Sequence, residues 1–357
     1  MRICLAVKKT DHYVNKFIPE LAWGLEYAGN EVGIGVETIW SESVFQYDVV
    51  YFHWPEFLFN GASNEDCEKL RKKIREMKDA GITIAAHCHN LKPHDPSKTI
   101  ELALYKIVYE NCDVMIHMGG YSLKKMQTDY PKTRHFLVPH HIYSHFYSFS
   151  YDSLSARRHL KLSKSKCVIL CFGAFRNEKE RNLFVFLRKK LNHSVFEIVA
   201  PSYFRGKIIQ KNILKGLNNL VKIIQYKLKG IKFTTKFLND DEMQMYFCAA
   251  DIILIQRPDI LNSGNLPMGF AAGKVVVGPD IGNISDLLVS TNNPVFKVGD
   301  DASLIDAIEM ARILVSNGHG ISNKKYAEAY WSPEKIGGTI TTFFQEVLDE
   351  KNNKEID

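Results

Sequence analysis

The sequence lacks three features that mark common classes of protein. No apolar run approaches the roughly 18 residues that a membrane-spanning helix needs. The N-terminal residues MRICLAVKKTDHYVNKF place a short apolar run before lysines, which is the reverse of a secretory signal. The seven cysteines include no CxxC pair and fall mostly in apolar runs, so we expect buried, reduced thiols and no disulfide. These absences predict a cytoplasmic protein.

The chain also lacks a strong charge of either sign. Its 46 basic and 40 acidic residues give a net charge of +6, which would favour anionic ligands or an anionic membrane surface. The dense basic stripe of a dedicated nucleic-acid binder is missing, so we expect no nucleic-acid partner. With 357 residues and 45% hydrophobic content, the chain suits two globular domains of ordinary size.

Apolar runs of strand length alternate with amphipathic stretches along the whole chain. Many of these runs are hydrophobic at nearly every position, as parallel strands covered on both faces require. The pattern predicts an α/β protein with two doubly wound, Rossmann-like domains that face each other across a cleft. The expected strands are residues 2–7, 48–54, 82–89, 113–118 and 134–140 in the first half and 167–175, 196–201, 231–237, 251–256 and 274–280 in the second.

The strand pattern lapses into polar, Ser- and Tyr-rich sequence between about Ser144 and Lys166, which predicts a domain boundary there. We therefore expect domains at 1–150 and 151–328. Residues 329–357 are expected to form a closing helix and a polar tail, because Ser332-Pro333-Glu334 is a helix-entry signal.

Several residues of the first half lie at predicted strand ends and could carry acid–base chemistry. Glu56 follows His53 and a proline that ends the strand, and His89 and Asp95 follow the next strand. A carboxylate beside histidines can act as a base when a closed cleft raises its pKa. Glu56 is the first choice for this base and Asp95 the second. His140 stands at the last strand end before the boundary, where it could contact an acceptor or a donor substrate or form part of a hinge wall.

Two segments of the second half suit a diphosphate. Arg176 and Lys179, in FGAFRNEK, follow a strand, and two cations there can neutralise paired phosphates. Ser263, Gly264 and Asn265 precede a helix, where a hydroxyl and backbone amides can bind phosphate oxygens. The alternatives are a solvated loop in which Glu178 and Glu180 pair with the cations, and an ordinary helix cap at Ser263.

In order and spacing, these segments resemble the GT-B glycosyltransferases of the "group 1" type that build bacterial capsular and exopolysaccharides. The resemblance rests on HWPE (53–56), HCHNLKPHD (87–95), FGAFRNEK (172–179), DDEMQMYFCAADIILI leading into ILNSGN (240–265), and YWSPEKI (330–336). It implies that the second half binds a nucleoside-diphosphate sugar through Arg176, Lys179 and Ser263–Asn265. It also implies that His89 lies against the donor sugar.

The chain departs from many retaining members of that superfamily, which carry two glutamates eight positions apart. Ile260 and Met268 stand near those places, and neither can accept a hydrogen bond from a ribose hydroxyl. The NSG form is similar to a subset that includes β-mannosyltransferases using GDP-mannose. We therefore expect transfer from GDP-mannose or another nucleoside-diphosphate hexose, with inversion favoured over retention.

The resemblance also implies an acceptor that is a saccharide or is lipid-linked, in bacterial surface polysaccharide synthesis. The basic stretches 68–78 and 8–17 suggest peripheral contact with the inner face of the plasma membrane. No metal or other cofactor is expected, because no histidine–carboxylate pair has the helical spacing of a metal site and this superfamily typically works without a bound divalent ion.

The alternatives to a glycosyltransferase are a sugar-nucleotide epimerase or hydrolase of the same fold, and a non-catalytic two-domain binding protein.

Overall fold

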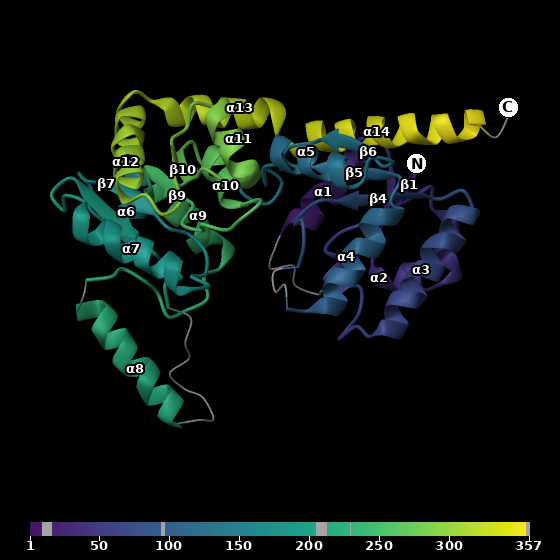
Figure 1. The fold of residues 1–357 in the computed structure, drawn as a ribbon. Helices are drawn as coiled ribbons and strands as arrows, with labels where there is room; N and C mark the ends of the chain where they lie inside the picture. The colour runs from purple at the N-terminus through teal and green to yellow at the C-terminus, as the bar shows by residue number, and fades with distance from the viewer. Residues whose placement is uncertain (9–15, 94–96, 205–212, 229, 355–357) are drawn as a thin grey trace. The chain divides into compact units, whose positions relative to one another are not determined.

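The computed structural model describes residues 1–8, 16–93, 97–204, 213–228 and 230–354 of the chain. These residues form two compact units (Figure 1). Unit 1 comprises Met1–Phe146 and Ala329–Asp357, and unit 2 comprises Tyr147–Glu328. Among the described helices, none is both long and apolar enough to cross a lipid bilayer.

Unit 1 contains a six-stranded sheet in the order β2-β1-β3-β4-β5-β6, with every pair parallel. Strands β3, β4 and β5 are buried along their whole length because helices cover both faces. The order reverses at β1, so the crevice beside the carboxyl ends of β1 and β3 is the expected ligand position of such a sheet. The strands are β1 (Arg2–Ala6), β2 (Glu31–Ile34), β3 (Val49–Phe52), β4 (Thr83–His87), β5 (Val114–His117) and β6 (Arg134–Leu137).

The helices of unit 1 follow the strands in alternation, and the C-terminal helix joins them. They are α1 (Phe17–Tyr27), α2 (Val36–Ile39), α3 (Asn64–Asp79), α4 (Thr99–Asn111), α5 (Gly120–Asp129) and α14 (Pro333–Lys354), with short 3-10 turns η1 (Glu42–Gln46) and η2 (Pro55–Phe57). Helix α3 begins at a capping box formed by Ser63 and Asp66.

Unit 2 contains a five-stranded sheet in the order β11-β10-β9-β7-β8, again with every pair parallel. Its order reverses at β7, which places the expected ligand crevice beside the carboxyl ends of β7 and β9. The strands are β7 (Cys167–Leu170), β8 (Phe196–Val199), β9 (Ile252–Leu254), β10 (Val275–Pro279) and β11 (Val295–Phe296).

Unit 2 contains eight described helices, most of which pack around this sheet (Figure 1). They are α6 (Ser153–His159), α7 (Glu178–Lys190), α8 (Ile213–Leu228), α9 (Asp240–Ala249), α10 (Asn265–Ala271), α11 (Gly282–Ser290), α12 (Asp301–Ser316) and α13 (His319–Tyr330), which continues two residues into unit 1. The two parallel sheets confirm the predicted α/β class. The α8 helix lies away from the sheet of unit 2 (Figure 1).

The strand predicted at 231–237 is wrong. Lys232 makes a single isolated bridge with Val199, and Thr234 donates to the Pro201 carbonyl at 2.9 Å, but no regular strand forms. The apolar side chains of Ile231 and Phe233 pack against the core cluster of unit 2 without continuing the ladder. Burial of alternate side chains therefore produced a strand-like pattern in an irregular segment. Strand β2 is short and partly exposed, and strand β11 has only two residues, so neither gives a clear apolar run in the sequence.

Helices α1 and α14 cross so closely that two glycines are needed at the crossing. A Cβ on Gly24 would collide with the Pro333 carbonyl, and one on Gly337 would collide with the Gly24 carbonyl. This contact joins the last helix of the chain to the first helix of unit 1. The neighbouring Gly338 has no such constraint, because a Cβ there would meet no atom within 4 Å.

We predict that Gly337→Ala destabilises the protein by about 1–3 kcal/mol, since the added methyl group must separate two helix backbones. Gly338→Ala is the matched control, and it should be neutral or stabilising by up to about 1 kcal/mol because alanine favours helix. Urea unfolding of both variants measures the difference. Equal stability of the two variants would contradict the close crossing.

Candidate functional site

The histidines predicted as site residues in unit 1 lie together at the carboxyl ends of the strands. His53 follows β3 and His89 follows β4, and their Nδ1 and Nε2 atoms are 2.9 Å apart in a hydrogen bond. The ring of Phe17, at the start of α1, lies 4.7 Å from His89 and 5.0 Å from His140 between centroids. The structure therefore brings His53, His89 and His140 together around one aromatic ring.

Trp54 is part of this cluster, although the sequence analysis did not select it. Its indole ring stacks on His89 with centroids 3.9 Å apart and planes 16° apart. Its backbone is left-handed, with φ at 44°, which is strained for a bulky residue. The stacking of the ring on His89 offsets this strain. The sequence HWPE contained the residue but no signal of its backbone angle.

His87 and Tyr51 were also missed. The Tyr51 hydroxyl and His87 Nδ1 are 2.5 Å apart, and the His87 ring stacks on His89 at 4.4 Å. The spacing of His87 and His89 was the available signal, because residues two apart on an extended chain point to the same side.

The imidazoles of this cluster are neutral at neutral pH. Burial lowers the pKa of His53 to about 3 and that of His140 to about 4, and it holds the pKa of His87 and His89 well below the usual range. Within the described part of the chain, His53 Nε2 and His87 Nε2 are buried without a hydrogen-bond partner. Each can donate to or accept from a ligand hydroxyl, because a neutral imidazole has one donor and one acceptor nitrogen.

Among the described residues of unit 1, three of these histidines could hold a metal. His53, His87 and His89 each offer a ring nitrogen within 4.8 Å of the others. Three nitrogens bound to one Zn²⁺ at about 2.0–2.1 Å would have to converge on a point between them. The rings of His87 and His89 instead stack within 20° of parallel, so binding would require them to rotate. The absence of a required metal stays a prediction.

Glu56 lies one turn beyond His53, in η2. Burial raises the pKa of its carboxyl group, and a hydrogen bond from Tyr105 opposes part of this rise. Its Oε2 atom is buried and has no hydrogen-bond partner among the described residues. A carboxylate with a raised pKa and a free oxygen has the properties of a general base. Asp95, the second candidate, lies outside the described residues.

In unit 2, the two segments predicted to bind a diphosphate come from neighbouring strands. The loop after β7 carries Arg176, and the loop after β9 carries Ser263 and Asn265. The Asn265 side-chain amide donates to the Phe172 carbonyl at 2.9 Å, which ties the second loop to the first. Gly173 has φ at 96°, a conformation that favours glycine, so the chain can turn directly after the strand.

A fully buried carboxylate organises this part of unit 2. Glu180 accepts the backbone N–H of Arg176 at 2.9 Å, and its other oxygen lies 3.9 Å from Arg257 Nε. Arg257 also donates to the Ala174 carbonyl at 3.4 Å. Glu180 therefore holds the loop backbone and one arginine, and the side chains of Arg176 and Lys179 are exposed. The sequence analysis missed Arg257, although its position just beyond β9 was the available signal.

Ser263 and Asn265 also serve the start of α10. The Asn265 backbone N–H donates to Ser263 Oγ at 3.3 Å, and Gly264 is the residue that precedes the helix. The Ser263 hydroxyl therefore satisfies a helix-end donor, as an ordinary cap does. This hydroxyl can still donate its own hydrogen to an anion, because only its oxygen is used in the cap.

Comparison with known proteins gives a fold match and no sequence match. No protein-family model matches the chain, and no curated protein matches it significantly. The structure is similar to sucrose-phosphate synthase from Thermosynechococcus elongatus, with a TM-score of 0.69 and 13% identity over 98% of this chain and 99% of that one. This chain has the GT-B fold. The match confirms the predicted fold of two Rossmann-like domains.

Two further solved structures have the same fold over their full length. The HepE protein of Anabaena in complex with UDP gives a TM-score of 0.70 and 13% identity, over 97% of this chain and 100% of that one. A glycosyltransferase from Rickettsia africae gives a TM-score of 0.67 and 13% identity, over 97% and 98%. Identities this low establish the architecture, and residue roles must come from the side chains described above.

The buried histidines predict that the protein loses stability as the pH falls. Since His53 has a folded pKa of about 3 and an unfolded value of 6.5, the unfolded state binds more protons between these limits. The free energy of unfolding should fall on acidification below 6.5. Between pH 7 and pH 5 this single group accounts for about 2 kcal/mol.

Urea unfolding of the wild type and of His53→Asn at pH 7 and pH 5 isolates this contribution. The variant should show the smaller fall, by about 2 kcal/mol. Glu20, whose pKa burial raises to about 7, has the opposite pH dependence, and comparing the two proteins cancels it. Parallel pH dependence in the two proteins would show that His53 is not held neutral.

Proposed function

We propose that the protein is a glycosyltransferase that takes a sugar from a nucleoside-diphosphate sugar bound to unit 2. The observation that carries this proposal is the pair of tied loops after β7 and β9, where buried Glu180 accepts the Arg176 backbone N–H and faces Arg257. The side chains of Arg176 and of Lys179, just after it, are exposed. Cations at the carboxyl ends of parallel strands suit a diphosphate, whose oxygens they bind and whose departure they assist. HepE structures with UDP and UDP-glucose lend support from the same fold.

The proposal extends to the identity of the donor and to the stereochemistry of the transfer. We infer a nucleoside-diphosphate hexose, with GDP-mannose as the first candidate from the NSG sequence at 262–264. UDP in HepE and ADP in starch synthase IV of Arabidopsis thaliana make uracil and adenine the competing bases. Inversion is favoured because Ile260 and Met268 replace the two carboxylates of many retaining enzymes.

Unit 1 supplies the acceptor chemistry in this proposal. Glu56 removes the proton of the acceptor hydroxyl as its oxygen attacks the anomeric carbon, and the nucleoside diphosphate leaves with the bonding electron pair. The neutral imidazoles of His53 and His89 bind sugar hydroxyls without adding charge. The acceptor is a saccharide or a lipid-linked saccharide of surface polysaccharide synthesis, and no metal takes part.

We predict that Arg176→Ala weakens binding of the nucleoside diphosphate about tenfold to one-hundredfold, since a charge-assisted hydrogen bond to phosphate is lost. Thermal shift and calorimetric titration with UDP, GDP and ADP measure the effect and identify the base. Lys189→Ala is the matched control, because Lys189 is exposed in the last turn of α7, the helix that follows Arg176. If no nucleoside diphosphate stabilises the wild type, the donor assignment is wrong.

We predict that Glu56→Gln lowers kcat by a hundredfold or more while the KM of the donor stays within a few-fold, because the amide cannot accept the proton. Turnover is measured with labelled donor at saturation. Glu101→Gln is the control, since this nearby carboxylate already pairs with Lys98 at 2.6 Å and should tolerate the change. Near-normal turnover of Glu56→Gln would reject this residue as the base.

A further inference from the structure

Helix α8 of unit 2 has apolar residues on two opposite faces. The inner face packs on the body of the unit through Ile223, which is buried, and Tyr226, whose ring lies 5.0 Å from that of Tyr203. Tyr226 also contacts Phe233 at 6.1 Å. One apolar face is therefore enough to attach the helix to unit 2, and the second needs a separate explanation.

The outer face is an exposed apolar stripe. Its residues are spaced by 3, 4, 7 and 11 positions from the first, which places them on one side of a helix. They are between 39% and 83% exposed, and they are Leu217, Leu220, Val221, Ile224 and Leu228. Contiguous exposed apolar residues of this kind mark a surface that another apolar phase covers.

Charge in this part of the sequence is of one sign. Residues 205–239 contain nine lysines and arginines and no aspartate or glutamate. The remainder of the chain has 37 basic and 40 acidic residues, a net charge of −3. The positive charge of the whole protein therefore comes from the segment that contains α8. Lys222 and Lys227 are exposed and flank the stripe on opposite sides at helical spacing.

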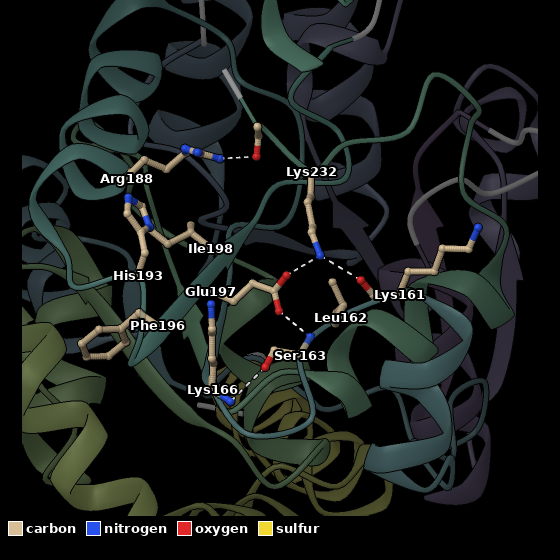
Figure 2. Close-up of a pocket in the computed structure, with 11 residues that line it drawn as sticks. Lys161, Leu162, Ser163, Lys166, Arg188, His193, Phe196, Glu197, Ile198 and Lys232 are labelled. Carbon is tan, nitrogen blue, oxygen red and sulfur yellow. Dashed lines mark hydrogen bonds and ion pairs between the residues drawn. The ribbon is translucent and has the colours of Figure 1, made fainter. Parts of the chain in front are cut away.

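The basic character continues beyond the end of the helix. Gly230, two residues after α8, is one of the residues that line a cavity of about 460 Å³. The cations Lys161, Lys166, Arg188 and Lys232 also line this cavity (Figure 2). Glu197 lines it too, and Lys232 pairs with this carboxylate. The Arg188 guanidinium donates to the Gly230 carbonyl. One acidic group thus faces several cations in this recess, which favours anionic groups such as phosphates.

We propose that α8 docks the protein on an anionic lipid bilayer, with the apolar stripe in the interfacial region and the surrounding cations on phosphate headgroups. An apolar stripe flanked by lysines and free of acidic residues is the pattern of helices that lie in a membrane surface. Nucleic acid offers phosphates but no phase that would cover five aliphatic side chains. This inference is independent of the proposed sugar transfer.

Helix α3, whose basic sequence first suggested membrane contact, lacks these features. Its apolar residues Leu70, Ile74 and Met77 are buried. Its cations pair along the helix, with Arg71 3.6 Å from Glu68 and Lys73 3.5 Å from Glu76. The other basic stretch in that prediction, 8–17, falls largely on residues 9–15, which lie outside the described residues. The structure favours α8.

The test is flotation of the full-length protein with vesicles of phosphatidylcholine alone or with added phosphatidylglycerol. We expect binding to the anionic vesicles, reduced by high salt. Leu220→Ser/Ile224→Ser should weaken it at least about tenfold by removing apolar burial, and Lys222→Glu/Lys227→Glu should do so by reversing charge. All of these side chains are exposed, so the variants should keep the wild-type Tm.

Matched controls come from exposed residues of the same unit. Met310→Ser/Ile313→Ser removes two apolar side chains of α12 that are 57% and 53% exposed, and Lys297→Glu/Lys325→Glu reverses two exposed charges. Both should bind vesicles as the wild type does. As a direct measurement, an Ile224→Trp variant should shift its tryptophan emission to shorter wavelength when anionic vesicles are added.

Three results would overturn the proposal. One is no binding of the wild type to anionic vesicles. Another is wild-type binding by Leu220→Ser/Ile224→Ser, which would show adsorption by charge alone. The third is a concentration-dependent oligomer in sedimentation that the same double variant abolishes, without vesicle binding, which would make the stripe a contact between copies of the chain.

Discussion

Parallel pairing is the constraint on which the chemistry of this protein depends. In both sheets every described strand pair is parallel, so the carboxyl ends of all the strands in a sheet lie along one edge. Residues far apart in the chain meet there without any local sequence signal. In unit 1 this edge gathers His53, His89 and His140 around Phe17. In unit 2 it joins Asn265 to Phe172 across 93 positions of sequence.

The two edges differ in charge state, and the difference follows from burial. The imidazoles of His53, His87 and His89 in unit 1 are enclosed by aromatic rings, and this burial lowers the pKa of each, so they are neutral hydrogen-bonding groups. In unit 2 the buried group is a carboxylate, Glu180, which fixes the loop backbone and faces one arginine. Arg176 and Lys179 are exposed cations beside it. Neutral donors and acceptors suit hydroxyl groups, and cations suit a diphosphate.

The sequence predicted the strands best where burial on both faces makes every position apolar, as in 49–52, 83–87 and 275–279. It failed at 231–237, where apolar side chains enter the core from an irregular backbone. For the site, strand-end position selected His53 and His89 correctly as neighbours of each other. Trp54 was not selected, and Glu180 was considered only as a solvated partner of the cations. A left-handed backbone angle and a buried carboxylate both result from tertiary packing, which a single sequence does not show.

Helices α3 and α8 illustrate the same limit in the prediction of a binding surface. Both have apolar residues at helical spacing and several lysines, but from the sequence only α3 was considered for membrane contact, because it lies in the expected acceptor half. Amphipathic periodicity predicts that the apolar face of a helix is buried, but it does not identify the surface that buries it. The sheet of unit 1 already covers the apolar face of α3, and glutamates neutralise its polar face. In α8 the core of unit 2 takes up one apolar face and leaves a second one exposed beside unpaired charge of one sign. Exposing a second apolar face to water is unfavourable for the isolated chain. We therefore interpret this face as a surface that the helix uses for binding.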